Sequence, residues 1–400
     1  MTTDTAALTD ETLAAVTAAA HGDASADGLL DTLLLRGCTG SGAPADPLVL
    51  DHAAVRDADP LGLDAVLRRL PLLNDAGDTG SLTAVLAAAV ERGGSVTGPE
   101  PAAAALRDTG MVMASLRRHG VDPVAAVPGL AALLTRWAAA SGTIPRDTVV
   151  HYGWWNPTGP RERHYTTATA QESLLIDSVR QSCRTLPAAS IGLDRAWHAG
   201  LTTPVALLAL GAAVQALQSY GAMFETVRTG VSPVWFAQQL RPYFDPITVD
   251  GVAYCGPAAA FVPLYLVDEL LWGTGADHTA LHREAVEYGR TLWRDRRGEL
   301  ADHPPLDEVV AERLHREGET AELAEAARLF SLATRALVRF RGQHATLARG
   351  AYRTDVTGYS TGSGGWAPAT LLSITTENRD AATHLDDERR CAGHHRQQRP

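Results

Sequence analysis

Apolar residues recur every three or four positions along most of this chain, which is the spacing of one buried face on an α-helix. Residues 242–256 differ, because Ile247–Val249 and Val252–Tyr254 flank Asp250-Gly251, a two-residue turn signal that predicts one small hairpin. No alternation of strands and helices is present, so the pattern predicts an all-α fold and not a Rossmann fold or a barrel. The strongest helical patterns cover residues 102–120, 170–183, 203–227, 233–243, 258–273, 278–297 and 319–353.

The same pattern divides the chain into three parts. Residues 1–145 form an N-terminal helical part, in which the segment 1–60 is rich in Ala and Asp and poorly defined. Residues 146–385 form a second part with longer helices, which opens with an aromatic, turn-rich segment at 152–160 that we expect to be a loop. The polar residues 386–400 are expected to be disordered.

Composition excludes several classes of function. The chain of 400 residues contains no Lys, so it has neither a Schiff-base lysine for pyridoxal phosphate nor a P-loop lysine. A formal charge of -11 disfavours nucleic acid and anionic membranes as partners. The four Cys residues lack metal-site spacing, and neither a leader nor an uninterrupted membrane span is evident, so we expect a reduced, cytoplasmic protein.

One histidine stands out within the pattern of 319–353. Phe330, Leu337, Phe340 and Leu347 follow helical steps and place His344 on the same apolar stripe. A neutral imidazole on a dry helix face suits an axial haem ligand. From the stripe alone, a core histidine bonded to a carbonyl is the simpler interpretation.

A glycine-rich segment, TGYSTGSGGW, follows this helix at 357–366. Four glycines in ten residues let the backbone approach a ligand closely, and Ser363 can offer its hydroxyl to a pocket. A flexible turn or a hinge explains the same composition.

Three further patterns suggest other chemistry, and each is weak. Gly358–Gly362 fits the G-x-S-x-G elbow of serine hydrolases, but an elbow requires a preceding strand and a sheet. His278 and His282 have the spacing of two metal ligands on a helix, but no Glu completes the motif and their surroundings look solvated. The pair His394-His395 belongs to the polar tail.

The segments around His344 resemble a known family. RFRGQHATLARGAY and TGSGGWAPATLL are similar to the proximal-histidine helix and glycine loop of the tryptophan and indoleamine 2,3-dioxygenase haem superfamily, in particular its monodechloroaminopyrrolnitrin synthase branch. The resemblance runs in order from about Leu70 to Leu372. The segments that carry it include AAALRDTGMVMASLRRHG, VPGL, WWNPTG, ESLLIDSVR, LRPYFDPITVDGVAYCGPAA and VDELLWG.

The resemblance implies a set of site residues. His344 would be the axial ligand of haem b, and Gly256, Gly362, Gly364 and Gly365 would lie against the haem. Tyr352 and Ser363 match positions that face substrate or a haem propionate, and Ser363 would take part in catalysis. Phe236 and Arg241 match an aromatic residue and an arginine that hold the substrate. Arg suits this role because its fork can bind a carboxylate through two bonds, although a surface arginine before Pro242 is the alternative.

One position departs from the family pattern. Phe261 occupies the start of the pocket helix, where the pyrrolnitrin branch has an acidic residue. Its apolar ring would contact the substrate and change which substrate the site prefers. The segment 1–60 and the segment after about Asp380 also look longer than the family norm.

Together the resemblance implies a haem-dependent oxygenase of secondary metabolism that uses O2 and an electron donor. Its substrate would be tryptophan or a halogenated tryptophan, changed by oxidative rearrangement and decarboxylation as in pyrrolnitrin (antibiotic) biosynthesis. The alternatives are a hydroxylase or 2,3-dioxygenase of another aromatic amino acid, and a haem-binding sensor without turnover. Whether the protein forms a homo-oligomer stays open.

Overall fold

A computed structural model describes residues 3–36, 48–272, 276–300, 304–318, 320–353 and 358–397. These residues form helices of very different length and one two-stranded sheet, so the predicted all-α class with a small hairpin is confirmed. In chain order the elements are α1 (Thr3–Ala20), η1 (Ala24–Ala26), α2 (Asp27–Arg36), α3 (His52–Asp57), α4 (Asp64–Leu67), α5 (Leu70–Ala76), α6 (Thr79–Gly93), α7 (Pro99–Arg118), α8 (Pro123–Ala126), α9 (Leu130–Ser141), η2 (Val150–Trp154), η3 (Gly159–Arg161), α10 (Thr169–His198), α11 (Pro204–Gly230), α12 (Pro233–Trp235), η4 (Phe236–Leu240), η5 (Arg241–Phe244), β1 (Ile247–Val249), β2 (Val252–Tyr254), η6 (Ala259–Phe261), α13 (Tyr265–Leu271), α14 (Ala276–Glu287), α15 (Thr291–Leu300), α16 (Leu306–Glu317), α17 (Ala321–Ala351) and α18 (Pro368–Gln397).

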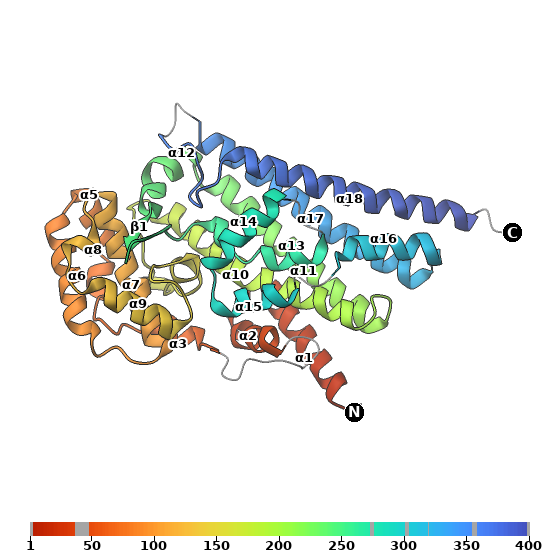
Figure 1. Cartoon of the computed structure of the whole chain (residues 1–400), viewed down its shortest axis with the longest axis horizontal. Helices are drawn as coiled ribbons and strands as arrows, with labels where there is room; N and C mark the ends of the chain where they lie inside the picture. Colours follow the sequence, from red (N-terminus) through yellow and green to blue (C-terminus); the bar gives the residue numbers. More distant parts are fainter. Residues whose placement is uncertain are drawn as a thin grey trace.

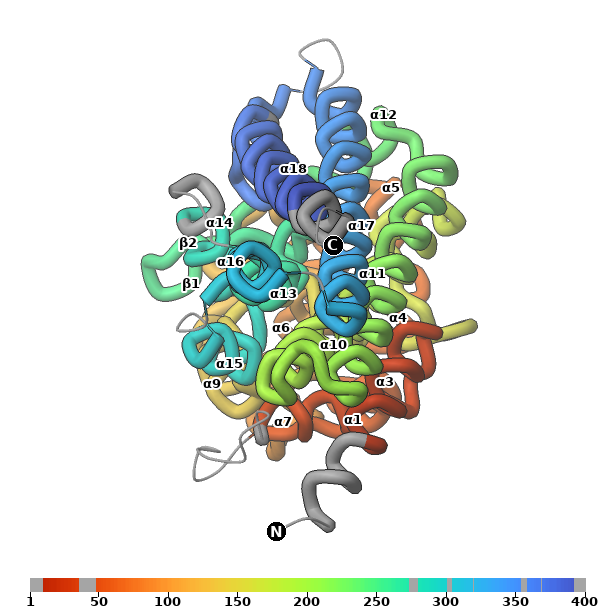
Figure 2. The backbone as a smooth tube through the Cα atoms, turned by 90° about the vertical axis from the view of Figure 1, so that its right-hand side faces the viewer, coloured from red at the N-terminus to blue at the C-terminus, as the bar shows by residue number. Residues whose placement is uncertain are grey.

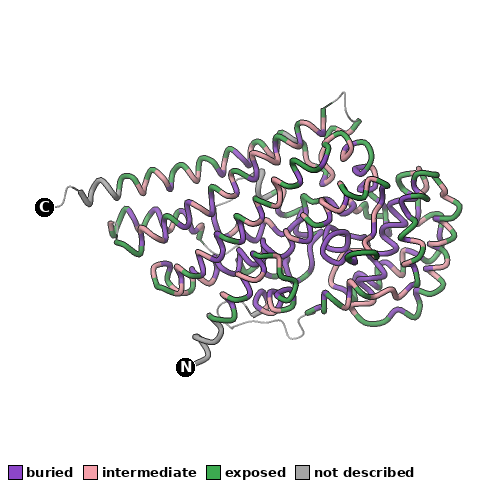
Figure 3. The backbone as a smooth tube through the Cα atoms, turned by 180° about the vertical axis from the view of Figure 1, so that it is seen from behind, coloured by how far each residue is buried: buried purple, intermediate pink, exposed green. Residues whose placement is uncertain are grey.

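The long helices pack side by side in one body. α10 packs against α11, α11 against α17, and α17 against α18 (Figure 2). α5–α9, which include most of the shorter helices, gather at the left-hand end of the molecule in Figure 1, here called the short-helix end. Buried residues concentrate in the middle of this body, and the outer part of α18 is mostly exposed or half-buried (Figure 3). The site described below lies where α10, α11, α17 and α18 meet.

Two apolar clusters form the core. One contains most of the buried residues of α5–α9 together with β1. The other joins α10, α11, α13 and α15–α17, and it also includes Val16, Leu30 and Val55 from the segment 1–60. The start of the chain therefore packs with the long-helix body, and only the segment from Leu61 onwards builds the short-helix end.

Buried ion pairs fix the start of the chain to this body. Asp31 of α2 accepts two hydrogen bonds of 2.6 Å from Arg290, and His52 Nε2 lies 3.0 Å from its Oδ2. The indole N–H of Trp155 in turn donates to His52 Nδ1 at 2.8 Å. Each member is buried, so each needs the others to satisfy its polar atoms.

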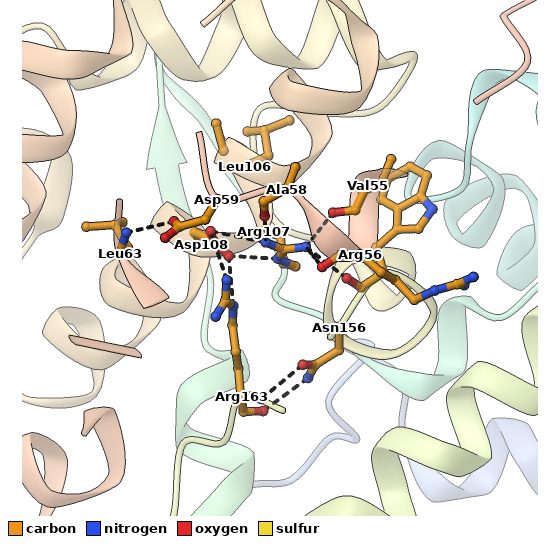
Figure 4. A network of polar contacts seen from close by, with 12 residues as sticks. Val55, Arg56, Ala58, Asp59, Leu63, Leu106, Arg107, Asp108, Asn156 and Arg163 are labelled. Carbon is orange, nitrogen blue, oxygen red and sulfur yellow. Dashed lines mark hydrogen bonds and ion pairs between the residues drawn. The ribbon is translucent and has the colours of Figure 1, made fainter. Parts of the chain in front are cut away.

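A second buried network joins the two clusters (Figure 4). The Arg107 guanidinium donates to the carbonyls of Val55, Ala58 and Trp155 and to the carboxylate of Asp108. Arg163 donates to that same carboxylate at 3.0 and 3.2 Å. Residues 55–58 and 155–163, which are far apart in the sequence, are thereby both held on α7.

The hairpin forms with the expected turn. Val249 pairs with Val252, and Asp250 and Gly251 both have positive φ (48° and 82°), as a type I′ turn requires. Most predicted helices are present, but several segments differ from expectation.

The helix predicted over 170–183 continues to His198 as α10, although Pro187 lies inside it. A proline removes one backbone donor and favours a break, but packing against α11 along the helix holds it. The region 258–273 is instead divided, because Val262 precedes Pro263 and adopts an extended conformation (φ -61°, ψ 152°) between η6 and α13.

The loop expected at 152–160 is wrong for its first three residues, because they belong to the buried π-helix η2 (Val150–Trp154). The tail also differs from the expected disorder, because α18 runs through Gln397. Leu385 on α18 is buried, and Arg335 of α17 donates to Asp386 at 2.6 Å. Cys38 lies outside the described residues.

Among the described helices, α11 is long and apolar enough to cross a membrane by length and composition alone. Half of its most apolar window is buried, and α1, α10 and α17 all pack against it. A helix covered on several sides by other helices needs this apolar composition in a protein core as well.

Candidate active site around His344

α17 carries His344 into a large internal cavity. The buried residues Phe330, Ala333, Leu337 and Phe340 form the predicted stripe, and the His344 ring follows them in sequence, stacked 5.7 Å from the ring of Phe340. Phe224 of α11 approaches the imidazole edge-on at 5.7 Å. The ring thus lies against two phenylalanine rings and also borders the cavity.

The imidazole is held neutral. Its burial by the surrounding protein lowers the pKa of His344 to about 4, and the nearby positive charge of Arg341 acts in the same direction. No described residue forms a hydrogen bond with the His344 ring, so the simpler interpretation, a core histidine bonded to a carbonyl, finds no support. A neutral ring with an accessible nitrogen is the form that binds a metal.

The cavity has two lobes that meet at His344. The larger lobe has a volume of about 1130 Å³ including its mouth, and the smaller one about 620 Å³. Tyr220, Phe340 and His344 border both lobes.

The larger lobe is apolar with one polar corner. Its walls come mainly from α10, α11, α12, η4, η6 and α17, and Phe236 contributes its half-buried ring. The polar corner holds Tyr352, at the end of α17, and Ser363. Burial raises the pKa of Tyr352, and this effect is opposed by Arg241 and by hydrogen bonds with Ser363.

The glycine loop, residues 358–366, closes this corner. The N–H of Gly362 donates to the carbonyl of Trp366 at 2.8 Å, and Gly365 has a positive φ of 86°. A Cβ on Gly364 would lie 2.7 Å from the Cβ of Ala260, so only glycine lets the loop reach η6. The loop follows the helix α17, and no strand leads into it within the described chain, so the serine elbow is excluded.

The structure brings together most of the residues predicted for the site. His344, Phe236, Tyr352, Gly362, Ser363 and Gly364 all line the larger lobe. Arg241 is buried directly behind Tyr352 and does not reach the wall itself.

Three further predicted residues lie away from the wall. Gly256 packs against Phe244 and Arg146, where a Cβ would be 2.8–2.9 Å from their atoms. Phe261 is buried, stacks on Tyr288 at 4.1 Å and supports the loop from behind Gly364. Gly365 is exposed on the outer side of the loop.

The smaller lobe contains charged residues that the sequence did not reveal. Asp268 of α13 accepts from Arg341 of α17 at 2.5 Å and lies 3.1 Å from His282 Nε2. His282 is buried, so the expectation that its surroundings are solvated is wrong. Burial lowers the pKa of His282, but hydrogen bonds with Asp268 and Glu269 outweigh burial and raise it.

Those interactions do not make a metal site. The described residues contain no group of three His, Cys, Asp or Glu side chains able to hold an ion, and the side chain of His278 lies outside the described residues. The same holds for the side chains of His394 and His395.

Other wall residues could have been found from helical spacing. Tyr220 and Phe224 are four residues apart on α11, one turn of the same face, and both meet the ring of Phe340. The π-helical turn η4 gave no signal in the sequence. Its i to i+5 bond from the Arg241 N–H to the Phe236 carbonyl places Arg241 one wide turn beyond Phe236.

A comparison with protein families agrees with this geometry. The family model described as monodechloroaminopyrrolnitrin synthase PrnB matches residues 79–394, which is more than half of the chain. The chain belongs to this family. The expectation of an enzyme related to pyrrolnitrin synthesis is thereby confirmed at the level of the family. The match includes α17, the glycine loop and the segment with Phe236 and Arg241, and it leaves out α1–α5.

Proposed function

We propose that this protein is a haem-dependent oxygenase that acts on tryptophan or a halogenated tryptophan. In this proposal His344 binds the iron of haem b, and the reaction is an oxidative rearrangement with loss of the carboxylate. O2 is the co-substrate, and an external electron donor is required.

The observation that carries the proposal is the state of His344. Its ring is neutral, borders both lobes of the cavity and forms no hydrogen bond with a described residue. Haem needs a dry slot and one nitrogen donor, and the apolar walls supply the slot. When bound there, haem would supply the activation of O2.

The remaining residues would bind and orient the substrate. The ring of Phe236 and the neighbouring apolar wall suit an indole, which buries an aromatic surface. The hydroxyls of Tyr352 and Ser363 would receive the polar head group at the other end, and the buried charge of Arg241 behind them would attract a carboxylate. The cavity walls would exclude water from the indole and from the polar head group.

The first experiment is an absorption titration of protein expressed with haem supplied. Wild type is expected to show the Soret band of histidine-ligated haem, shifted by L-tryptophan or 7-chloro-L-tryptophan. His344→Ala should lose that spectrum and regain it with added imidazole, whereas His315→Ala, at an exposed position on α16, should not change it. A folded wild type that takes up no haem would refute the proposal.

Product mass then separates the reactions. Loss of carbon dioxide from the substrate supports the rearrangement. One added oxygen atom with the carboxylate retained would show a hydroxylase, and two added oxygen atoms would show a 2,3-dioxygenase.

A further inference from the structure

Arg241 lies behind the polar corner of the larger lobe with its charge already balanced. Only 6% of its side chain is exposed, and its Nη1 donates to Asp245 Oδ1 at 2.8 Å. The ring of Tyr359 packs 4.1 Å from the guanidinium carbon. The guanidinium also forms a hydrogen bond with the hydroxyl of Tyr352. Its buried Nε finds no acceptor among the described residues, although an unpaired donor is costly in such a site.

Asp245 is held from two sides. One carboxylate oxygen accepts from Arg241, and the other accepts from the hydroxyl of Tyr359 at 3.0 Å. Tyr359 belongs to the glycine loop that also carries Ser363 into the cavity wall. The glycine loop is therefore linked to the ion pair of Arg241 through the Asp245 carboxylate as well as through the ring of Tyr359.

The two partners of this ion pair differ in their access to water. The side chain of Asp245 is 30% exposed, five times the exposed fraction of Arg241. If the pair opens, the carboxylate can return to water at little cost, but the guanidinium stays buried and must find another anion. Asp245 can therefore leave the ion pair at a lower cost in free energy than Arg241 can.

We propose that Asp245 is a resident counter-ion that competes with the ligand's carboxylate for Arg241, and that Tyr359 holds it in place. A carboxylate that enters past Tyr352 and Ser363 would take over Arg241, including its unused Nε, and release Asp245 toward solvent. Asp245 thereby sets how strongly the site prefers ligands with a carboxylate. This inference rests on the proposed function, because it assumes an amino-acid ligand in the larger lobe.

The test compares three indole ligands on the haem-loaded protein. L-Tryptophan and indole-3-propionate carry a carboxylate, and tryptamine does not. Removing the competitor with Asp245→Asn should tighten binding of both carboxylate ligands about tenfold, because more of the protein has a free guanidinium. Binding of tryptamine should stay the same, and Asp387→Asn, in an exposed ion pair of α18, should change none of the three.

Tyr359→Phe provides an independent variant that keeps every charge. It removes one of the two bonds that hold Asp245 and should shift the carboxylate ligands in the same direction by a smaller factor. Adding Arg241→Ala to Asp245→Asn should abolish the gain. Tyr359→Phe keeps the test decisive if Asp245→Asn folds poorly, because it leaves Asp245 and Arg241 unchanged.

Several results would overturn the inference. Weaker binding of the carboxylate ligands to Asp245→Asn would show that Asp245 supports the site, and an equal change for tryptamine would show a general structural role. If the wild type binds none of the three indoles, it is the proposed function that fails, so the two failures are distinguishable.

Discussion

Asp31 shows how much a single buried charge contributes to the stability of this protein. Burial alone would raise its pKa, but the Arg290 guanidinium and the His52 ring outweigh burial and lower that pKa to about 2. The folded protein therefore stabilises the ionised form. Because the pKa is depressed, this contribution is complete above the ordinary value near 3.8 and is lost as the pH falls toward 2.

We predict that Asp31→Asn lowers the free energy of unfolding by about 3 kcal/mol at neutral pH, since it leaves Arg290 buried and uncompensated. Denaturant unfolding at a series of pH values measures this. The difference from wild type should shrink between about pH 4 and pH 2. Glu225→Gln, in an exposed pair with Arg228, is the control and should have no measurable effect. A difference that does not change with pH would contradict the argument.

Residues differ in how far the sequence reveals their roles. His344 could be found because a single imidazole interrupts an apolar stripe, whereas Asp31 could not, since its partner Arg290 lies 259 positions away. The environment of His282 is also hidden from the sequence, because Asp268, the acid that lies within hydrogen-bond distance of its ring, comes from another helix. A local pattern predicts on which face of a helix a side chain lies, but it does not predict which other elements pack against that face.

At the scale of elements, the contact between α10 and α11 depends on small residues. A Cβ on Gly192 of α10 would lie 2.9 Å from the carbonyl oxygen of Ala209 and 3.0 Å from the Cβ of Ala213, both on α11. The backbones therefore approach too closely for any side chain. A Cβ added to Gly211 of α11 would have no such neighbouring atom within 4 Å.

The same substitution should consequently have opposite effects at these two glycines. Gly192→Ala should destabilise the protein by about 1–3 kcal/mol, because α10 and α11 must separate. Gly211→Ala should stabilise it by about 0.5–1 kcal/mol, because alanine favours a helix interior. Thermal unfolding of both variants measures the contrast, and equal shifts would contradict the packing described.

The elements themselves were largely predictable, since helical periodicity and the Asp250-Gly251 turn are local signals. The ends of the elements were less predictable. The helical pattern predicts an end at residue 183, but α10 continues through Pro187 to His198 in contact with α11. The π-turns η2 and η4 shift the spacing of side chains by one residue and leave no compositional trace.

At the scale of the whole molecule, the part of the chain that matches the family model is shorter than the part that packs together in one fold. The match begins at residue 79, within α6, but Val16, Leu30 and Val55 belong to the same apolar cluster as α10, α11 and α17. The resemblance gave no information about the segment 1–60. Its role became visible only in the packing.

We predict that protein lacking residues 1–50 does not fold to a stable monomer. The deletion exposes the α10 and α11 surface that α1 and α2 cover, and it leaves Arg184 and Arg290 without Asp27 and Asp31. Size-exclusion chromatography and thermal unfolding check this. A monodisperse truncated protein with an unchanged Tm would show that the start of the chain is dispensable.

The indoles that anchor the start of the chain also give the molecule an optical signature. The stacked rings of Trp154 and Trp293, 6.0 Å apart, and Trp155 beside them are almost fully buried and lie outside the walls of the cavity. An indole in a dry, rigid site fluoresces at shorter wavelength than one in water. Red-shifted emission from this cluster would therefore signal that the N-terminal helices have come away from the body, before the long helices themselves unfold.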